Sequence, residues 1–164
     1  MKKNRISQVL AGVAMMAFCV FGISACGSDD NNPTPNRPLQ MYGEWVSAIQ
    51  QSGVLMFESD VFNNGTVEAT LYKIYGNNVM SGSKLVKANV TKIEKSGALG
   101  SFTYKDGILT VTYGSSQSSG SLKYGDDTNV VYWNVNGNNL EMLRANDATN
   151  AFKSQVETLY KEQN

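Results

Sequence analysis

The sequence contains no histidine, only two cysteines and only three prolines. Without histidine, the chain lacks the general base of Ser-His-Asp and Cys-His sites and the side chain that completes many zinc sites. The acidic residues Glu44, Asp60, Glu68 and Glu141 are scattered along expected strands, so we interpret them as surface charges rather than as a glycosidase pair. We therefore expect a protein that is not an enzyme and that holds no metal and no cofactor.

Long hydrophobic runs are also scarce, and the one near the N-terminus spans residues 9–23. It is shorter than the roughly 20 apolar residues that a membrane-spanning helix needs. Lys2, Lys3 and Arg5 precede it and small residues end it, which is typical of a secretory signal peptide. We predict that residues 1–25 are this signal. Because Cys19 lies within it, no disulfide is expected in the mature chain.

The end of this signal, Ile23-Ser24-Ala25-Cys26, resembles the lipobox of bacterial lipoproteins. The resemblance implies that Cys26 is the lipidation site, where acyl chains such as palmitate hold the protein in a membrane. An ordinary signal peptide with an incidental cysteine is the alternative. Residues 27–32, Gly-Ser-Asp-Asp-Asn-Asn, resemble the acidic tract of surface-exported lipoproteins of the Bacteroidetes, and a solvated linker is the other interpretation. The implied location is the cell envelope, anchored to the outer membrane on its periplasmic or surface face.

Residues 26–40 contain every proline of the chain, and we interpret them as a polar tether that precedes a domain over residues 41–164. Removal of residues 1–25 would take away three basic side chains and no acidic ones, which leaves a small net negative charge. No basic stripe with interleaved aromatic residues remains. We therefore expect no nucleic-acid partner.

Short apolar runs separated by glycine and asparagine clusters indicate several β-strands in the domain. The dipeptide Asp106-Gly107 can adopt the two positive φ angles of a type I′ turn. A two-residue loop there pairs Tyr104 with Leu109 and Phe102 with Val111 on one face of a hairpin. The turn and the apolar pattern agree on this register.

The dipeptide Asn136-Gly137 predicts a second hairpin of the same kind, with Trp133 opposite Leu140. Further strands are expected over residues 43–49, 84–93 and 119–124. Together these segments give about eight or nine strands joined mostly by short turns. This order favours an all-β, antiparallel up-and-down β-barrel, and a β-sandwich is the alternative.

The sequence Asn63-Asn64-Gly65 allows two loop lengths between its flanking strands. A two-residue loop pairs Glu58 with Leu71 and places charges on the apolar face. A three-residue loop, with Gly65 in the left-handed position of a G1 bulge, instead pairs Phe57 with Leu71. We favour the three-residue loop because it keeps the apolar residues together.

After Arg144 the apolar residues follow the period of an amphipathic helix. Asn146 or Asp147 can cap its N-terminus. The helix is expected to pack against the outside of the barrel through a stripe formed by Phe152, Val156, Leu159 and Tyr160.

The first expected strand begins Gly43-Glu44-Trp45, which resembles the Gly-x-Trp motif of lipocalins. In that family the tryptophan closes the floor of an eight-stranded barrel beneath an arginine from the end of the last strand. Arg144 stands in the matching place here. The resemblance, which covers roughly residues 39–162, implies a lipocalin-like, calycin-type barrel with Trp45 and Arg144 as its floor pair.

The barrel interior is the candidate binding site, since a barrel of about eight strands either fills with side chains or holds one small ligand. The side chains expected to face inward and to line a ligand are Phe57, Leu71, Phe102, Tyr104, Leu109, Val111, Tyr113, Val131, Trp133 and Leu140. The hydroxyls of the two tyrosines suit an amphipathic ligand. We therefore expect a barrel that binds a small apolar or amphipathic molecule. A surface module that binds a protein or glycan through its loops is the alternative.

Overall fold

The computed structural model describes residues 41–164. The expected signal peptide, the lipidation site at Cys26 and the tether lie outside the described residues. The elements are β1 (Gly43–Gln51), β2 (Val54–Asn63), β3 (Thr66–Gly76), β4 (Met80–Ser81), β5 (Lys84–Leu85), the 3₁₀ helix η1 (Lys87–Asn89), β6 (Val90–Lys105), β7 (Ile108–Tyr113), β8 (Ser116–Tyr124), β9 (Val130–Val135), β10 (Asn138–Arg144) and the helix α2 (Asp147–Gln163).

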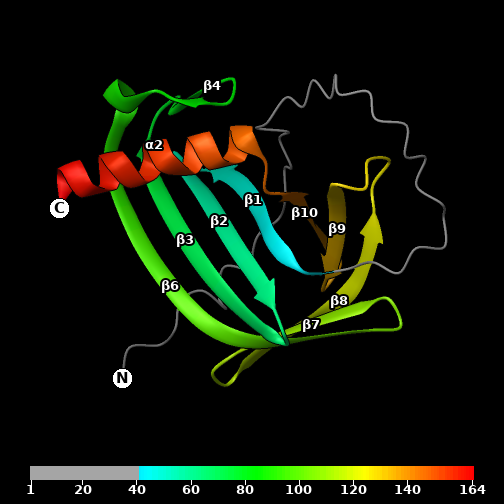
Figure 1. The fold of residues 1–164 in the computed structure, drawn as a ribbon. Coiled ribbons are helices and arrows are strands. Elements are labelled where there is room, and N and C mark those ends of the chain that lie inside the picture. The colour runs from blue at the N-terminus through cyan, green and yellow to red at the C-terminus, as the bar shows by residue number, and fades with distance from the viewer. Residues whose placement is uncertain (1–40) are drawn as a thin grey trace.

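Eight strands form a closed antiparallel barrel in the order β1-β10-β9-β8-β7-β6-β3-β2. β1 and β10 meet at the pairs Trp45–Arg144 and Val46–Leu143, which join the first strand of the barrel to the last. This closure confirms the expected all-β barrel and excludes the β-sandwich. Figure 1 shows β1, β2, β3 and the long β6 as one curved wall, with β7 to β10 completing the barrel.

Both hairpins expected at two-residue turns are confirmed. At Asp106-Gly107, Tyr104 pairs with Leu109 and Phe102 with Val111. At Asn136-Gly137, Trp133 pairs with Leu140 and Val131 with Met142. Asp106 and Asn136 have φ angles of 53° and 52°, and the glycines that follow them are also positive, as type I′ turns require.

The loop preferred at Asn63-Asn64-Gly65 is wrong. Asn63 pairs with Thr66, so the loop contains two residues, with φ angles of 47° at Asn64 and 78° at Gly65. The same local turn chemistry therefore decides all three hairpins. In this register Glu58 pairs with Leu71 and Asp60 with Ala69, the arrangement that the apolar pattern had disfavoured.

The single strand expected over residues 84–93 is wrong in its continuity, because this segment contains parts of two strands. Lys84–Leu85 pairs with Met80–Ser81, η1 follows, and the residues from Val90 onward belong to β6. The pairing that matters instead begins at Val90, because β6 runs without a break to Lys105 and pairs first with β3 and then with β7. Its first part is polar and shows little apolar alternation, which is why the sequence pattern did not reveal it.

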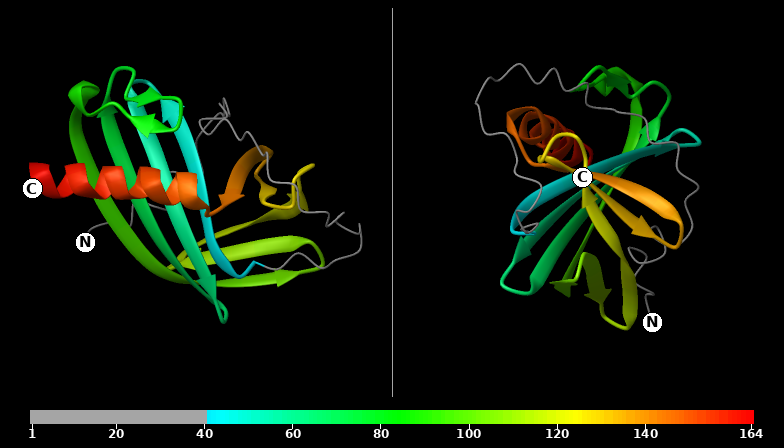
Figure 2. Two further views of the ribbon diagram at one scale, coloured as in Figure 1. Left: turned by 45° about the horizontal axis from the view of Figure 1, so that its top comes forward. Right: turned by 90° about the vertical axis from the view of Figure 1, so that its right-hand side faces the viewer.

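Helix α2 begins after Asn146, which forms a capping box with Thr149. Phe152, Val156 and Leu159 are buried against the outer face of the wall that contains β1, β2, β3 and β6. The position of the helix outside the barrel, as expected, is visible in both views of Figure 2. Several hydrogen bonds fix the helix to this wall. Lys153 Nζ donates to Glu44 Oε1 at 2.7 Å, the Tyr72 hydroxyl donates to Glu157 Oε1 at 2.7 Å, and the backbone N–H of Ile93 donates to Gln163 Oε1 at 2.9 Å.

Candidate ligand-binding interior

The strand register determines which side chains face the interior. Along β1, β2 and β3, the residues on the inner face meet in the cross-strand pairs Trp45–Asp60, Ser47–Glu58 and Glu58–Leu71. The intervening residues face outward and pack under α2. The interior therefore combines an apolar cluster with two carboxyl groups from neighbouring positions on one strand.

Trp45 and Arg144 lie together at one end of this interior. They pair across the β1–β10 seam, and the guanidinium of Arg144 lies 4.6 Å from the centroid of the Trp45 ring. Arg144 Nη1 also donates a hydrogen bond of 3.2 Å to the carbonyl of Tyr42. Trp45 is fully buried, so this end of the barrel is closed by side chains.

Most of the expected lining residues do face the interior. Leu71 lies opposite Glu58. Phe102 and Tyr104 are partly buried against the interior cluster, which contains Leu109, Val111, Tyr113, Val131, Trp133 and Leu140.

Phe57 is the exception, and its expected inward position is wrong. Its ring packs edge-on against Phe152 of α2, with the centroids 5.1 Å apart. The two-residue turn at Asn64-Gly65 is the physical reason, because a shift by one residue moves every side chain of a strand to the opposite face. The same shift corrects the interpretation of Asp60 as a surface charge.

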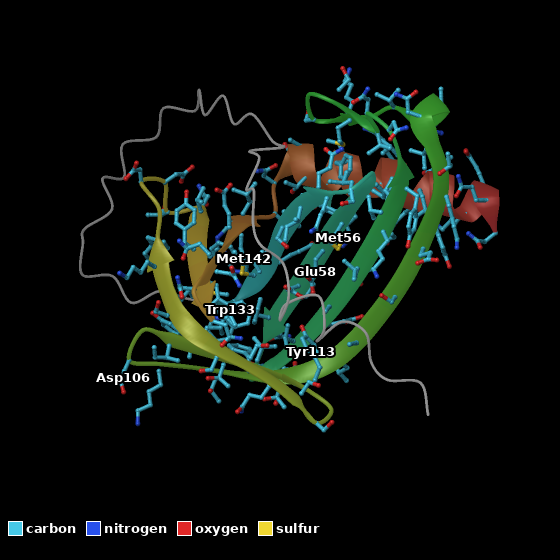
Figure 3. The ribbon with its side chains drawn as sticks, turned by 180° about the vertical axis from the view of Figure 1, so that it is seen from behind. Met56, Glu58, Asp106, Tyr113, Trp133 and Met142 are labelled. Carbon is cyan, nitrogen blue, oxygen red and sulfur yellow. The ribbon has the colours of Figure 1, made fainter. Side chains whose placement is uncertain are left out.

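The sequence-based list of lining residues omitted the interior side chains Met56, Glu58, Asp60, Phe62 and Met142, although the hairpin at Asn136-Gly137 already places Met142 on the same face as Trp133. The two-residue turn at Asn64-Gly65, followed through the alternation of β2, would have found the first four of them. Figure 3 shows Met56 and Glu58 of β2, Tyr113 of β7, Trp133 of β9 and Met142 of β10 directed into the barrel, whereas Asp106 lies at a hairpin tip.

The carboxyl of Glu58 lies in a strongly desolvated position. The residue is 9 % exposed. No described residue donates a hydrogen bond to its carboxyl, and Trp45 Nε1 is the one fully buried side-chain atom of residues 41–164 that lacks a partner, so the oxygens of Glu58 keep some contact with solvent. Burial raises the pKa of Glu58 from its usual value to about 7. Burial, and then the charge of Glu58, also raise the pKa of Asp60 well above its ordinary value.

Tyr113 supplies the one polar contact to this pair from the far side of the barrel. Its hydroxyl donates a long hydrogen bond of 3.4 Å to Asp60 Oδ1. Burial, followed by the nearby carboxyl charges, raises the pKa of the Tyr113 phenol, so it stays a donor. Gly100 makes this position available, since a Cβ there would lie 2.6 Å from the Tyr113 ring.

The interior-facing side of the wall is open to solvent at the end away from Trp45. There Tyr75 pairs with Lys92 and Lys73 with Glu94 across β3 and β6. Lys92 Nζ lies 2.7 Å from Glu94 Oε1, and their side chains are 62 % and 45 % exposed. The interior thus runs from a closed aromatic floor, past the partly buried Asp60 and the buried Glu58, to a charged and solvated rim.

Comparison of the chain with protein-family models, with curated proteins and with solved structures found no match in any of the three. Within residues 41–164, no helix is both long enough and apolar enough to span a membrane. The same residues contain no group of three or more histidine, cysteine, aspartate or glutamate side chains placed to hold a metal ion.

Proposed function

We propose that this protein is a lipid-anchored lipoprotein of the outer membrane whose lipocalin-like barrel binds a small apolar or amphipathic molecule without transforming it. The observation that carries the proposal is a closed barrel with a side-chain floor at one end and a solvated rim at the other. Barrels of this size hold a single small ligand or fill themselves with side chains. A carboxyl group is costly to bury in a core that is filled only by side chains, so Glu58 favours a barrel that holds a ligand over a barrel that is filled.

Two features of the sequence support the rest of the proposal. Ile23-Ser24-Ala25-Cys26 resembles a lipobox and supports attachment through acyl chains on Cys26. The absence of histidine from the whole chain supports binding without catalysis, because the usual general base is missing.

Native mass spectrometry of the protein purified from its own host tests the binding function. We expect a co-purifying small-molecule mass that is released when the protein is denatured. Trp133→Arg, which places a charge within the apolar part of the interior, should remove that mass, while Tyr132→Arg at the neighbouring outward position should retain it. A barrel that is always empty and whose side chains fill it completely would contradict the proposal.

A further inference from the structure

The interior of the barrel contains polar atoms that the described residues leave without partners. The carboxyl of Glu58 forms no hydrogen bond within residues 41–164, although the residue is nine-tenths buried. On the same interior face, the indole Nε1 of Trp45 is buried and has no hydrogen-bond partner there either. Trp45 lies directly opposite Asp60, and Glu58 lies two residues before Asp60 on the same face of β2. Buried polar groups are normally paired, so the unpaired carboxyl of Glu58 indicates that a hydrogen-bond donor is absent, whereas the indole N–H, itself a donor, would need a separate acceptor.

The charged groups around the two carboxyls do not supply that partner. Ser47 on β1 faces Glu58, and Trp45 faces Asp60. On β3, the nearest cation is Lys73, which lies opposite Met56 and acts on Glu94 of β6. Lys92 of β6 pairs with the same Glu94, whose second oxygen accepts from the Tyr75 hydroxyl.

From the other wall, Tyr113 of β7 donates one long hydrogen bond to Asp60, and Arg144 of β10 stacks on Trp45. Among residues 41–164, neither Glu58 nor Asp60 forms an ion pair with a lysine or arginine. The centre of the barrel therefore carries uncompensated negative charge whenever these carboxyls ionise.

The surroundings of the pair are apolar rather than aqueous. Leu71 lies opposite Glu58, and Met142 and Trp133 project toward it from β10 and β9. A small hydrated inorganic ion gains little from such neighbours. A cation that is covalently attached to a hydrocarbon body would satisfy both the carboxyls and the apolar wall.

We propose that the ligand of this barrel is an amphipathic amine, whose protonated nitrogen is held by the carboxylates of Glu58 and Asp60 while its hydrocarbon part packs against Trp133 and Met142. This inference rests on the proposed binding function and specifies the chemistry of its ligand. The ammonium donates hydrogen bonds to both carboxylates, and no covalent step is involved. The charged rim formed by Lys92 and Glu94 lies beyond the site, toward solvent.

The test compares three probes with the same ten-carbon chain, namely decylamine, decanol and decanoate, each below the concentration at which it forms micelles. Residues 27–164 are used without the lipid-bearing residue, because both hydrophobic clusters and every barrel strand lie within them. The chain has two tryptophans, Trp45 and Trp133, and both belong to the interior cluster. Tryptophan fluorescence therefore reports directly on occupancy of the barrel.

We expect decylamine to bind at least about tenfold more tightly than decanol, and decanoate to bind most weakly. Raising the pH through about 7, where Glu58 ionises, should strengthen decylamine binding and leave decanol binding unchanged. Glu58→Gln should reduce the affinity for decylamine to about that for decanol, and Asp60→Asn should act in the same direction. Glu68→Gln, on the outer face of β3, is the matched control and should change none of the three affinities.

Equal affinities for decylamine and decanol, or tighter binding of decanoate, would overturn the amine inference and leave the proposed binding function standing. Failure of all three probes to enter the barrel would count against the binding function itself. Thermal unfolding of each variant, followed by circular dichroism, verifies that a lost preference is measured on a folded barrel.

Discussion

Among single residues, Glu58 gives the stability of the empty barrel an uncommon dependence on pH. Its pKa is raised from 4.5 to about 7 by burial, so the folded chain holds the proton more tightly than the unfolded chain does. Its contribution to stability is fully present below about pH 4.5 and is lost as the pH rises through about 7. Asp60, whose pKa is also raised, acts in the same direction.

We therefore predict that the empty protein is more stable at pH 5 than at pH 8, by roughly 2 kcal/mol from Glu58. Glu58→Gln should remove most of this difference, because the neutral amide has no proton to lose. Denaturant unfolding of both proteins at the two pH values measures the effect. Stability that increases from pH 5 to pH 8 would refute the assigned burial of the carboxyl.

Glu44 is a useful contrast because it has the opposite linkage. Burial alone would raise its pKa, but hydrogen bonds from Lys153 and Ser59 and the charge of Lys153 lower it overall. Its stabilising contribution is therefore present above about pH 4.5 and is lost as the pH falls below that value. Glu58 inside the barrel therefore reduces its stability at high pH, and Glu44 outside the barrel reduces it at low pH.

Among the secondary-structure elements, helix α2 is held to the barrel by its apolar face. Phe152 on this face is completely buried against the outer wall. Phe152→Ala should lower the free energy of unfolding by about 3 to 5 kcal/mol, since it removes a large apolar side chain and leaves a cavity. Equilibrium denaturation measures this loss. Leu99→Ala is the matched control: Leu99 lies on β6 and is 74 % exposed, so the change should stay within about 0.5 kcal/mol. Similar losses for the two variants would show that α2 is not docked as described.

The elements that sequence reasoning predicted correctly are those fixed by local chemistry. Asp106-Gly107 and Asn136-Gly137 determine turn type and register from two residues each, and the capped stripe after Asn146 determines α2. β6 could not be predicted in the same way, because its pairing partners on β3 lie far away in the sequence and its first half is polar. Nonlocal pairing leaves little trace in the pattern of a single strand.

The candidate site was predicted less completely than the fold, and Glu58 and Asp60 show why. A carboxyl at an alternate strand position is usually exposed, so the apolar pattern favoured a register that turned both side chains outward. The actual register follows the turn at Asn64-Gly65 and places two acids on the inner face, with Glu58 buried and Asp60 partly buried. The geometry of the turn predicts that Glu58 and Asp60 face inward, whereas the usual exposure of carboxyl groups predicts that they face outward. Both residues belong to the interior that we propose as the binding site.

For the molecule as a whole, the proposed anchor makes a separate prediction. Cys26→Ser should abolish labelling by radioactive palmitate and release the protein from the membrane fraction, because serine offers no thiol for acylation. Cys19→Ser, within the expected signal peptide, is the matched control and should leave both unchanged. Labelling followed by fractionation of whole cells measures the two outcomes. Unaltered membrane association of Cys26→Ser would disprove attachment at this residue.

The closure between β1 and β10 has a mechanical consequence. The two strands pair only at Trp45–Arg144 and Val46–Leu143, whereas β2 and β3 pair along their whole length. The chain enters the barrel just before this seam, and Arg144 reaches back to the carbonyl of Tyr42. A pull on the N-terminus, which is the end that would carry the proposed anchor, is therefore applied beside the shortest ladder of the barrel. Tension would separate β1 from β10 before it disturbed the longer strand pairings. The first contact to break would be that between Trp45 and Arg144, which closes the floor.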